Sequence, residues 1–171
     1  MDVCKIANKF IALYPNRSAN NTLDFLDKVT KEMPFTIQRI QTDRGQEFFA
    51  YSVQEKLMKH KIKFRPIKPA SPHLNGKVER TQRTDLDEFY SSVNIKSPDL
   101  VQKLETWQEY YNKQRAHSSL QGQTSHEKYK KLESKIPSLE EVNQNFDLKK
   151  EVIITQDYKI YKMIKATQKV V

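Results

Sequence analysis

Apolar and polar residues in the first third of the chain follow a pattern typical of strands separated by a helix. Residues 9–14 are apolar and β-prone, and turn-forming residues follow them, which predicts a strand. Asn21 can cap a helix over residues 22–32, and Pro34 ends that helix. The β-branched stretch 36–42 then predicts a buried strand. The predicted order is therefore strand, helix, strand.

The alternation continues through the next part of the chain. Apolar residues spaced four apart predict an amphipathic helix over residues 49–60, and residues 62–65 alternate as a strand does. Residues 68–76 contain two prolines and an Asn-Gly pair, which predicts a loop. Because strands alternate with helices, the pattern favours an α/β fold.

After this loop the pattern is helical. Residues 77–91 are predicted to form one helix, and Ser97-Pro98-Asp99 predicts the start of another with Pro98 in its first position. Four large apolar side chains in that second helix follow a 4-3-4 spacing, which is typical of a buried stripe: Leu100, Leu104, Trp107 and Tyr111. We therefore expect this stripe to pack in the core.

The length of 171 residues suits one core and an appended segment. From residue 128 on the charge rises and the core signal weakens, while residues 151–165 suggest a β-hairpin. We predict a core domain over residues 1–127 and a small basic C-terminal extension over residues 128–171.

The charge of the chain favours an anionic partner. The formal net charge is +9, and residues 59–84 contain eight Lys and Arg against one acid. The single cysteine, Cys4, excludes an intramolecular disulfide and a thiolate zinc knuckle. No apolar run is long enough for a membrane span or a signal core. We expect a soluble intracellular protein, cytoplasmic or in the nucleoid if bacterial, that is not secreted.

Two carboxylates flank the basic region. Asp43 directly follows a predicted strand, Glu79 falls in the first turn of a predicted helix, and 35 residues separate them. Carboxylate oxygens in basic surroundings suit Mg²⁺ or Mn²⁺ that is shared with phosphate. A plainer interpretation also fits, since Asp-Arg-Gly is an ordinary turn and an acid near a helix start complements the helix dipole.

Three sequence blocks narrow this choice. Residues 42–48 read Thr-Asp-Arg-Gly-Gln-Glu-Phe, residues 68–80 include Asn-Gly-Lys-Val-Glu-Arg, and residues 111–120 include Arg-Ala-His-Ser-Ser-Leu. In this order and spacing the blocks resemble the catalytic core of insertion-sequence transposases and retroviral-type integrases, over roughly residues 10–128. The resemblance implies a ribonuclease H-like fold, a mixed sheet flanked by helices, and an Asp, Asp, Glu triad whose last two members stand 35 residues apart.

The resemblance also implies roles for particular residues. Asp43 matches the second Asp and Glu79 matches the Glu, so both are expected to be catalytic and to bind Mg²⁺ or Mn²⁺. The DNA-facing residues it implies are Lys68, Asn75, Lys77, Arg80 and Arg83. Lys77 and Arg80 would contact phosphates rather than bases, although a solvated surface lysine is the alternative for Lys77. The implied partners are mobile-element ends, target DNA and further copies of the chain.

The first Asp of the triad is the member without a match. The family carries it on an opening strand well upstream of the second Asp, a position that precedes Met1, and Asp2 is a poor substitute. The expectation is a truncated catalytic core that lacks this strand and shows little or no DNA cleavage by itself. Three hypotheses follow: a piece of a DNA-transferring enzyme, a catalytically inactive nucleic-acid-binding protein, or a basic assembly protein.

Overall fold

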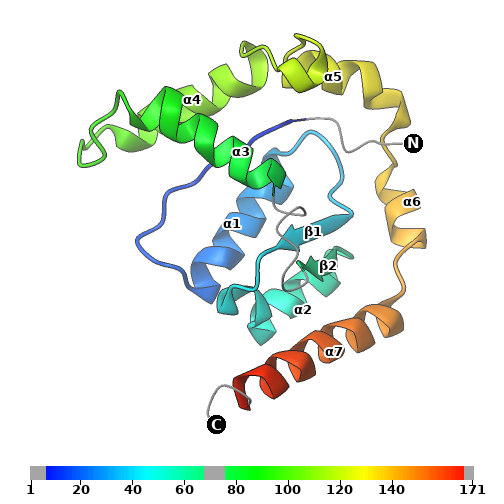
Figure 1. Ribbon diagram of the computed structural model, residues 1–171. Helices are drawn as coiled ribbons and strands as arrows, with labels where there is room; N and C mark the ends of the chain where they lie inside the picture. The colour runs from blue at the N-terminus through cyan, green and yellow to red at the C-terminus, as the bar shows by residue number, and fades with distance from the viewer. Residues whose placement is uncertain (1–6, 68–75, 168–171) are drawn as a thin grey trace. The chain divides into compact units, whose positions relative to one another are not determined.

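The computed structural model describes the backbone of residues 7–67 and 76–167 and the side chains up to residue 158. The chain forms two compact units, each built from two separated stretches (Figure 1). One unit contains Met1–Pro15 and Gly76–Ile136, and the other contains Asn16–Asn75 and Pro137–Val171. The position of one unit relative to the other is not determined.

The second unit contains a small parallel sheet. Strand β1 (Arg39–Thr42) pairs with β2 (Lys63–Pro66), so that Arg39 lies opposite Lys63 and Thr42 opposite Pro66. A 3₁₀ turn, η2 (Gln46–Phe49), and helix α2 (Tyr51–Lys59) connect the two strands (Figure 1). This strand-helix-strand order is the α/β pattern that the sequence predicts.

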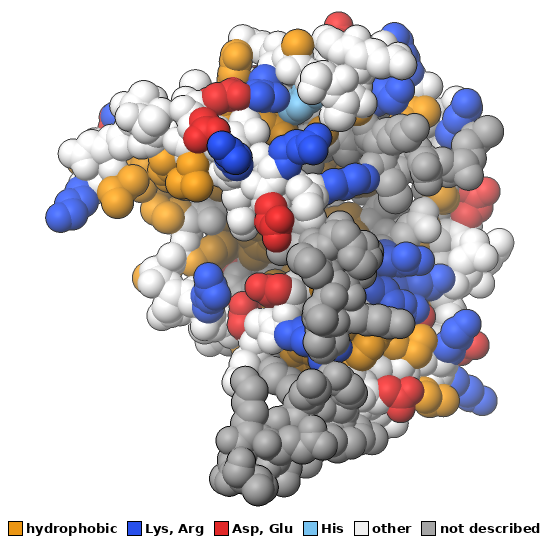
Figure 2. Space-filling model, in the orientation of Figure 1, with side chains coloured by type: hydrophobic (Ala, Val, Ile, Leu, Met, Phe, Trp, Pro, Cys, Tyr) orange, Lys and Arg blue, Asp and Glu red, His pale blue; other side chains and the backbone are white. Residues whose placement is uncertain are grey.

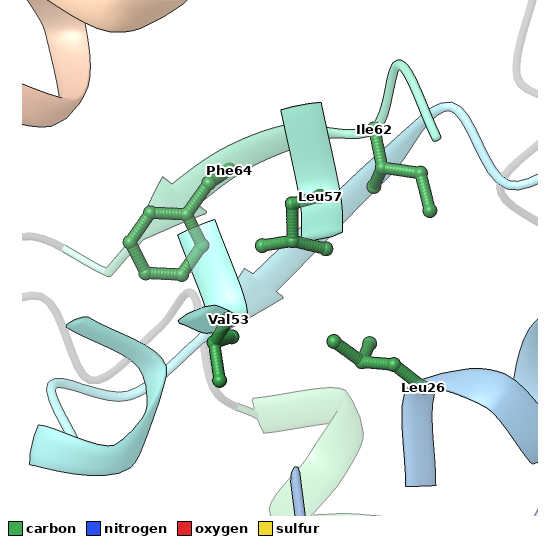
Figure 3. Close-up of a cluster of buried hydrophobic side chains, with 5 residues drawn as sticks. All are labelled: Leu26, Val53, Leu57, Ile62 and Phe64. Atoms are coloured by element: carbon green, nitrogen blue, oxygen red, sulfur yellow. The ribbon is translucent and has the colours of Figure 1, made fainter. Parts of the chain in front are cut away.

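One apolar cluster forms the core of this unit. Helix α1 (Ala19–Glu32) and α2 pack beside the sheet. The buried side chains come from both helices, from β2 and from the residue before β2 (Figure 3): Leu26, Val53, Leu57, Ile62 and Phe64. The rings of Phe49 and Phe64 meet edge to face with their centroids 5.4 Å apart. The spacing of four between Val53 and Leu57 places both on the inner face of α2, as predicted.

The C-terminal part of the chain is helical, and the predicted β-hairpin over residues 151–165 is wrong. Helix α6 (Leu139–Gln144) is followed by α7 (Leu148–Thr167). The carboxylate of Glu151 accepts two hydrogen bonds from the Arg65 guanidinium, at 2.5 and 2.7 Å, and only 6% of its side-chain surface is exposed. Thr155, one helical turn later, contacts Gln54 of α2. These partners favour a helix because residues four apart share one helical face.

The first unit is built from helices. Helix α3 (Gly76–Thr84) continues into a π-helical segment, η4 (Asp85–Tyr90), and α4 (Leu100–Lys113) follows after a turn. Three short elements complete the unit: η5 (Ser118–Leu120), α5 (Ser125–Leu132) and η6 (Glu133–Lys135). The predicted stripe on α4 is buried and packs with Phe89, which confirms that prediction. The predicted single helix over residues 77–91 is α-helical up to Thr84 and π-helical from Asp85 to Tyr90.

Residues 9–14 form no regular element and belong to neither strand of the described sheet, so the predicted strand is wrong. The backbone N–H of Lys9 donates to the Asn112 side-chain oxygen at 2.7 Å, and the Asn112 amide donates to the Lys9 carbonyl at 2.7 Å. The N–H of Ile11 donates to the Gln108 side chain at 2.6 Å. Side-chain amides on α4 therefore satisfy backbone groups that a neighbouring strand would otherwise satisfy.

The helix starts also differ from the sequence predictions. Ser18, not Asn21, caps α1, because its Oγ accepts the N–H of Asn21 at 3.3 Å while the Asn21 amide donates to the carbonyl of Asn16. Helix α4 begins at Leu100 with Asp99 as its N-cap, two residues after Pro98. The domain boundary near residue 127 stays a prediction, and α5 runs across that position. None of the helices in the described part of the chain has the length and apolar character needed to cross a membrane.

Candidate functional site

Asp43 lies where the strand pattern predicts, directly after β1. Its side chain is exposed, and its Oδ1 accepts the N–H of Gly45 at 3.2 Å. The Arg44 Nε donates to the carbonyl of Ile67 at 3.0 Å, which joins this turn to the residue that follows β2. The turn therefore presents the Asp43 carboxylate to solvent at the carboxyl end of two parallel strands, where sites form in α/β folds.

A second carboxylate folds back over the same turn. A Cβ atom added to Gly45 would lie 2.5 Å from the Glu47 Oε1, so any larger residue at this position would displace the Glu47 side chain. Glu47 belongs to the sequence block that carries Asp43, yet sequence reasoning did not single it out. Nothing in the spacing of the block indicates that its side chain turns backward.

Glu79 lies in the first turn of α3, and the helix that carries it has no buried residue. Lys77, Arg80 and Arg83 on the same helix are also exposed. Because successive residues turn by about 100°, Glu79 and Arg83 share one face and Thr81 lies nearly opposite. The Thr81 hydroxyl donates to the Lys77 carbonyl at 2.9 Å, and its closeness to Tyr111 of α4 opposes the rise in the pKa of that phenol. The helix therefore turns Thr81 toward α4 and presents Glu79 and Arg83 to solvent.

The structure describes these predicted residues within separate units. Asp43 lies in the unit that contains the sheet and Glu79 in the helical unit, so their meeting at one metal ion stays a prediction. Lys68 and Asn75 lie outside the described residues. Over residues 7–67 and 76–158, no three His, Cys, Asp or Glu side chains are grouped so as to hold a metal ion. The ion pairs described in this same part of the chain do not include Asp43 or Glu79.

Some of the basic side chains between residues 59 and 84 form ion pairs within the protein. The guanidinium of Arg65 is engaged by Glu151 and also donates to the carbonyl of Phe64 at 2.7 Å. The Arg83 Nε lies 3.6 Å from the Asp87 carboxylate, and both side chains are largely exposed. In the space-filling view Lys and Arg side chains lie at the surface with acidic side chains among them (Figure 2). Lys77 and Arg80 of α3 are exposed, and so are Lys59 and Lys61.

A polar cluster lies between η4, α4 and the N-terminal segment. The Asp85 carboxylate accepts the indole N–H of Trp107 at 2.7 Å and a hydrogen bond from the Lys9 ammonium. Burial lowers the pKa of Lys9, and the contact with Asp85 opposes that shift. Burial raises the pKa of the Tyr111 phenol. The cluster is a buried and internally paired group rather than an open site.

The third sequence block forms the neighbouring part of this unit. Arg115 donates to the Glu88 carboxylate through its Nε at 2.8 Å, and this hydrogen bond lowers the pKa of Glu88. The buried His117 lies 3.3 Å from the Arg115 guanidinium, the Tyr111 carbonyl and the Ser125 hydroxyl. Burial lowers the pKa of His117. Arg115 and His117 thus hold the end of α4 against η4 and α5.

Comparisons with known proteins agree with this architecture. A family model described as an integrase core domain matches residues 60–124, a segment shorter than half of the chain. The fold is similar to that of the catalytic core domain of BIV integrase, with a TM-score of 0.57 and 20% identity over 72% of this chain and 78% of the other. The search of curated proteins found no match.

The helix-rich fold with a small parallel sheet is the ribonuclease H-like fold of an integrase catalytic core. The family-model match covers α3, η4 and α4 and extends through His117. Together the two findings support an integrase or transposase catalytic core, as the three sequence blocks imply.

Proposed function

We propose that this chain is a catalytic-core protein of a mobile element that acts on DNA in integration or transposition. The observation that carries the proposal is helix α3, which has no buried residue. It exposes Glu79 together with Lys77, Arg80 and Arg83. A helix without a buried face gains little from the core, so its sequence is better explained by a partner in solution. The three cations suit the phosphate backbone of DNA.

The chemistry that we propose is metal-dependent phosphoryl transfer on DNA. Asp43 and Glu79 fit Mg²⁺ or Mn²⁺ in donor type, since both offer exposed carboxylate oxygens that pair with no cation among the described ion pairs. When bound, the metal would activate the attacking oxygen and stabilise the leaving oxygen. Lys77, Arg80 and Arg83 would hold the phosphates that flank the scissile bond.

A catalytically inactive DNA-binding protein is the second candidate. It rests on the same exposed basic side chains of α3, which need no metal ion to bind phosphate. In that case the exposed basic side chains of α3 would still bind DNA, while removal of the Asp43 or Glu79 carboxylate would leave binding intact. The two candidates share the DNA partner and differ in the use of the carboxylates.

Titration with Mn²⁺ separates these candidates. If the carboxylates bind metal, Asp43→Asn and Glu79→Gln should each weaken Mn²⁺ binding measured by calorimetry, and each should remove any Mn²⁺-dependent cleavage of duplex DNA. Glu105→Gln, on an exposed position of α4, serves as the matched control and should leave both unchanged. Mn²⁺ binding that neither Asp43→Asn nor Glu79→Gln alters would contradict the metal proposal and leave the inactive DNA-binding protein.

A further inference from the structure

Helix α3 has little support of its own, whereas the segment that continues it is firmly held. No residue of α3 is buried, but Asp85, the first residue of η4, has only 17% of its side-chain surface exposed. The Asp85 carboxylate accepts the Trp107 indole N–H at 2.7 Å and also pairs with the Lys9 ammonium. The same oxygen, Oδ1, takes both contacts.

Lys9 is held in place by several contacts besides the one with Asp85. Its side chain is 5% exposed, and its Nζ lies 3.9 Å from the centre of the Tyr111 ring and 5.7 Å from that of Trp107. Asn112 binds both the N–H and the carbonyl of Lys9 at 2.7 Å. The ammonium is therefore attached to α4 through its backbone and through two aromatic faces.

The position of Asp85 along the helix determines which residues of α3 share its face. Asp85 follows Thr81 by four residues, so both lie on one face; Asp85 bonds to Trp107 of α4 there, and Thr81 lies close enough to Tyr111 to affect its pKa. Glu79 and Arg83 lie on the opposite face. Because α3 and η4 are continuous, a rotation of the helix at Asp85 would turn Glu79 and Arg83 by the same angle.

We propose that Asp85 is a positioning residue, which sets the direction in which α3 presents Glu79 and Arg83 through its contacts with Lys9 and Trp107. The functional part of this inference rests on the proposed function, since it takes the Glu79 and Arg83 face as the one that meets DNA. The structural part does not depend on DNA and is measurable in the free protein.

The positioning role of Asp85 and its negative charge predict opposite effects on DNA binding when the charge is removed. The two explanations can therefore be distinguished by experiment. Asp85→Asn and Asp87→Asn each remove one negative charge from η4, and by electrostatics each should strengthen binding to DNA. Asp87 is the matched control because it lies two residues further along and pairs only with the exposed Arg83 among the described ion pairs. Positioning by Asp85 predicts that Asp85→Asn weakens DNA binding several-fold while Asp87→Asn does not.

The orientation of α3 is measured with spin labels inside the helical unit. Cysteines introduced by Gln82→Cys on α3 and Glu105→Cys on α4, both exposed, carry the labels, and Cys4→Ser removes the native thiol. We expect one narrow distribution of label distances in this background and after Asp87→Asn, and a broadened distribution after Asp85→Asn. An unchanged distribution after Asp85→Asn would overturn the inference.

A second variant covers the case in which Asp85→Asn does not fold because Lys9 is left as an unpaired buried charge. Lys9→Met combined with Asp85→Leu removes both charged groups and keeps apolar volume in the cluster. We expect this double variant to fold and to show the broadened distribution, whereas a narrow distribution would show that packing alone orients α3. Failure of the parent chain to bind duplex DNA at low salt would count against the proposed function, while the distance measurement would still decide the role of Asp85.

Discussion

His117 shows how one residue of the third sequence block acts in the folded chain. A guanidinium can only donate, so the Nδ1 of His117 must accept from Arg115, and a carbonyl can only accept, so the Nε2 must carry the proton toward Tyr111. The neutral ring fits both partners. A second proton would place an N–H against the Arg115 guanidinium, with Lys9 as a further nearby cation.

The free energy of unfolding should therefore fall on acidification through the pKa of an unfolded histidine, 6.5. The folded pKa lies below that value, so the unfolded chain takes up the proton first, at about 1.4 kcal/mol for each unit of difference. We expect urea denaturation at several pH values between about 8 and 5.5 to show this loss. His117→Gln should reduce the pH dependence, and His126→Gln, on an exposed position of α5, should not. An equal pH dependence in the parent and His117→Gln would contradict this role.

At the residue scale, the sequence placed Asp43 and Glu79 correctly on their elements. The end of a β-branched stretch and a helix start after Asn-Gly are local signals, which a sequence shows directly. The backward fold of Glu47 over Gly45 and the contacts of Asp85 had no such signal. In the sequence, Asp85 is one of several polar residues in a predicted helix. Nothing near it in the sequence indicates that it contacts Lys9 and Trp107.

At the scale of elements, the attachment of α7 is the feature that most departs from the predicted pattern. The Arg65 and Glu151 side chains form a two-bond ion pair, and 25% and 6% of their side-chain surfaces are exposed. The residues are 86 positions apart in the chain. The sequence around Glu151 therefore gives no sign that its partner is Arg65 of β2.

Glu151→Gln should destabilise the chain, because it leaves the Arg65 guanidinium partly buried without its counter-charge. We expect a loss of about 2 kcal/mol in the free energy of unfolding, below the range for fully buried pairs because Arg65 is partly exposed. Urea denaturation followed by circular dichroism measures it. Glu109→Gln breaks an exposed pair with Lys113 and should leave the stability unchanged. Equal stability of Glu151→Gln and the parent would show that the ion pair does not secure α7.

The N-terminal segment departs from the pattern for a related reason. Residues 9–14 have strand-like composition, but Gln108 and Asn112 supply the backbone partners that would otherwise come from a strand. β-propensity reflects how well side chains fit a pleated and half-buried surface, not a commitment to a particular sheet. This segment of strand-like composition therefore bonds to side chains of a helix instead.

At the scale of the whole molecule, the net charge of +9 and the exposed basic side chains of α3 determine how DNA affinity should depend on salt. Each phosphate contact that is lost should reduce the slope of log K against log salt concentration by about 1. The triple change Lys77→Gln, Arg80→Gln and Arg83→Gln should lower both the affinity and the slope measured by fluorescence anisotropy on duplex DNA. Lys113→Gln, on α4 of the same unit, is the control. A slope that the triple change leaves intact would place the DNA contacts elsewhere.

By itself the sequence determined the α/β order, the apolar stripe of α4, the helix that carries Glu79 and the resemblance to integrase cores. These features depend on spacings within one element or on short blocks, which local backbone geometry converts directly into structure. Only the tertiary structure decided that α7 is a helix paired with β2 and that residues 9–11 lie along α4. It alone also showed that Asp85 meets Lys9, 76 positions away. Burial of apolar surface brings such distant partners together. Because it is non-directional, the apolar spacing within one element does not show which other element that face will meet.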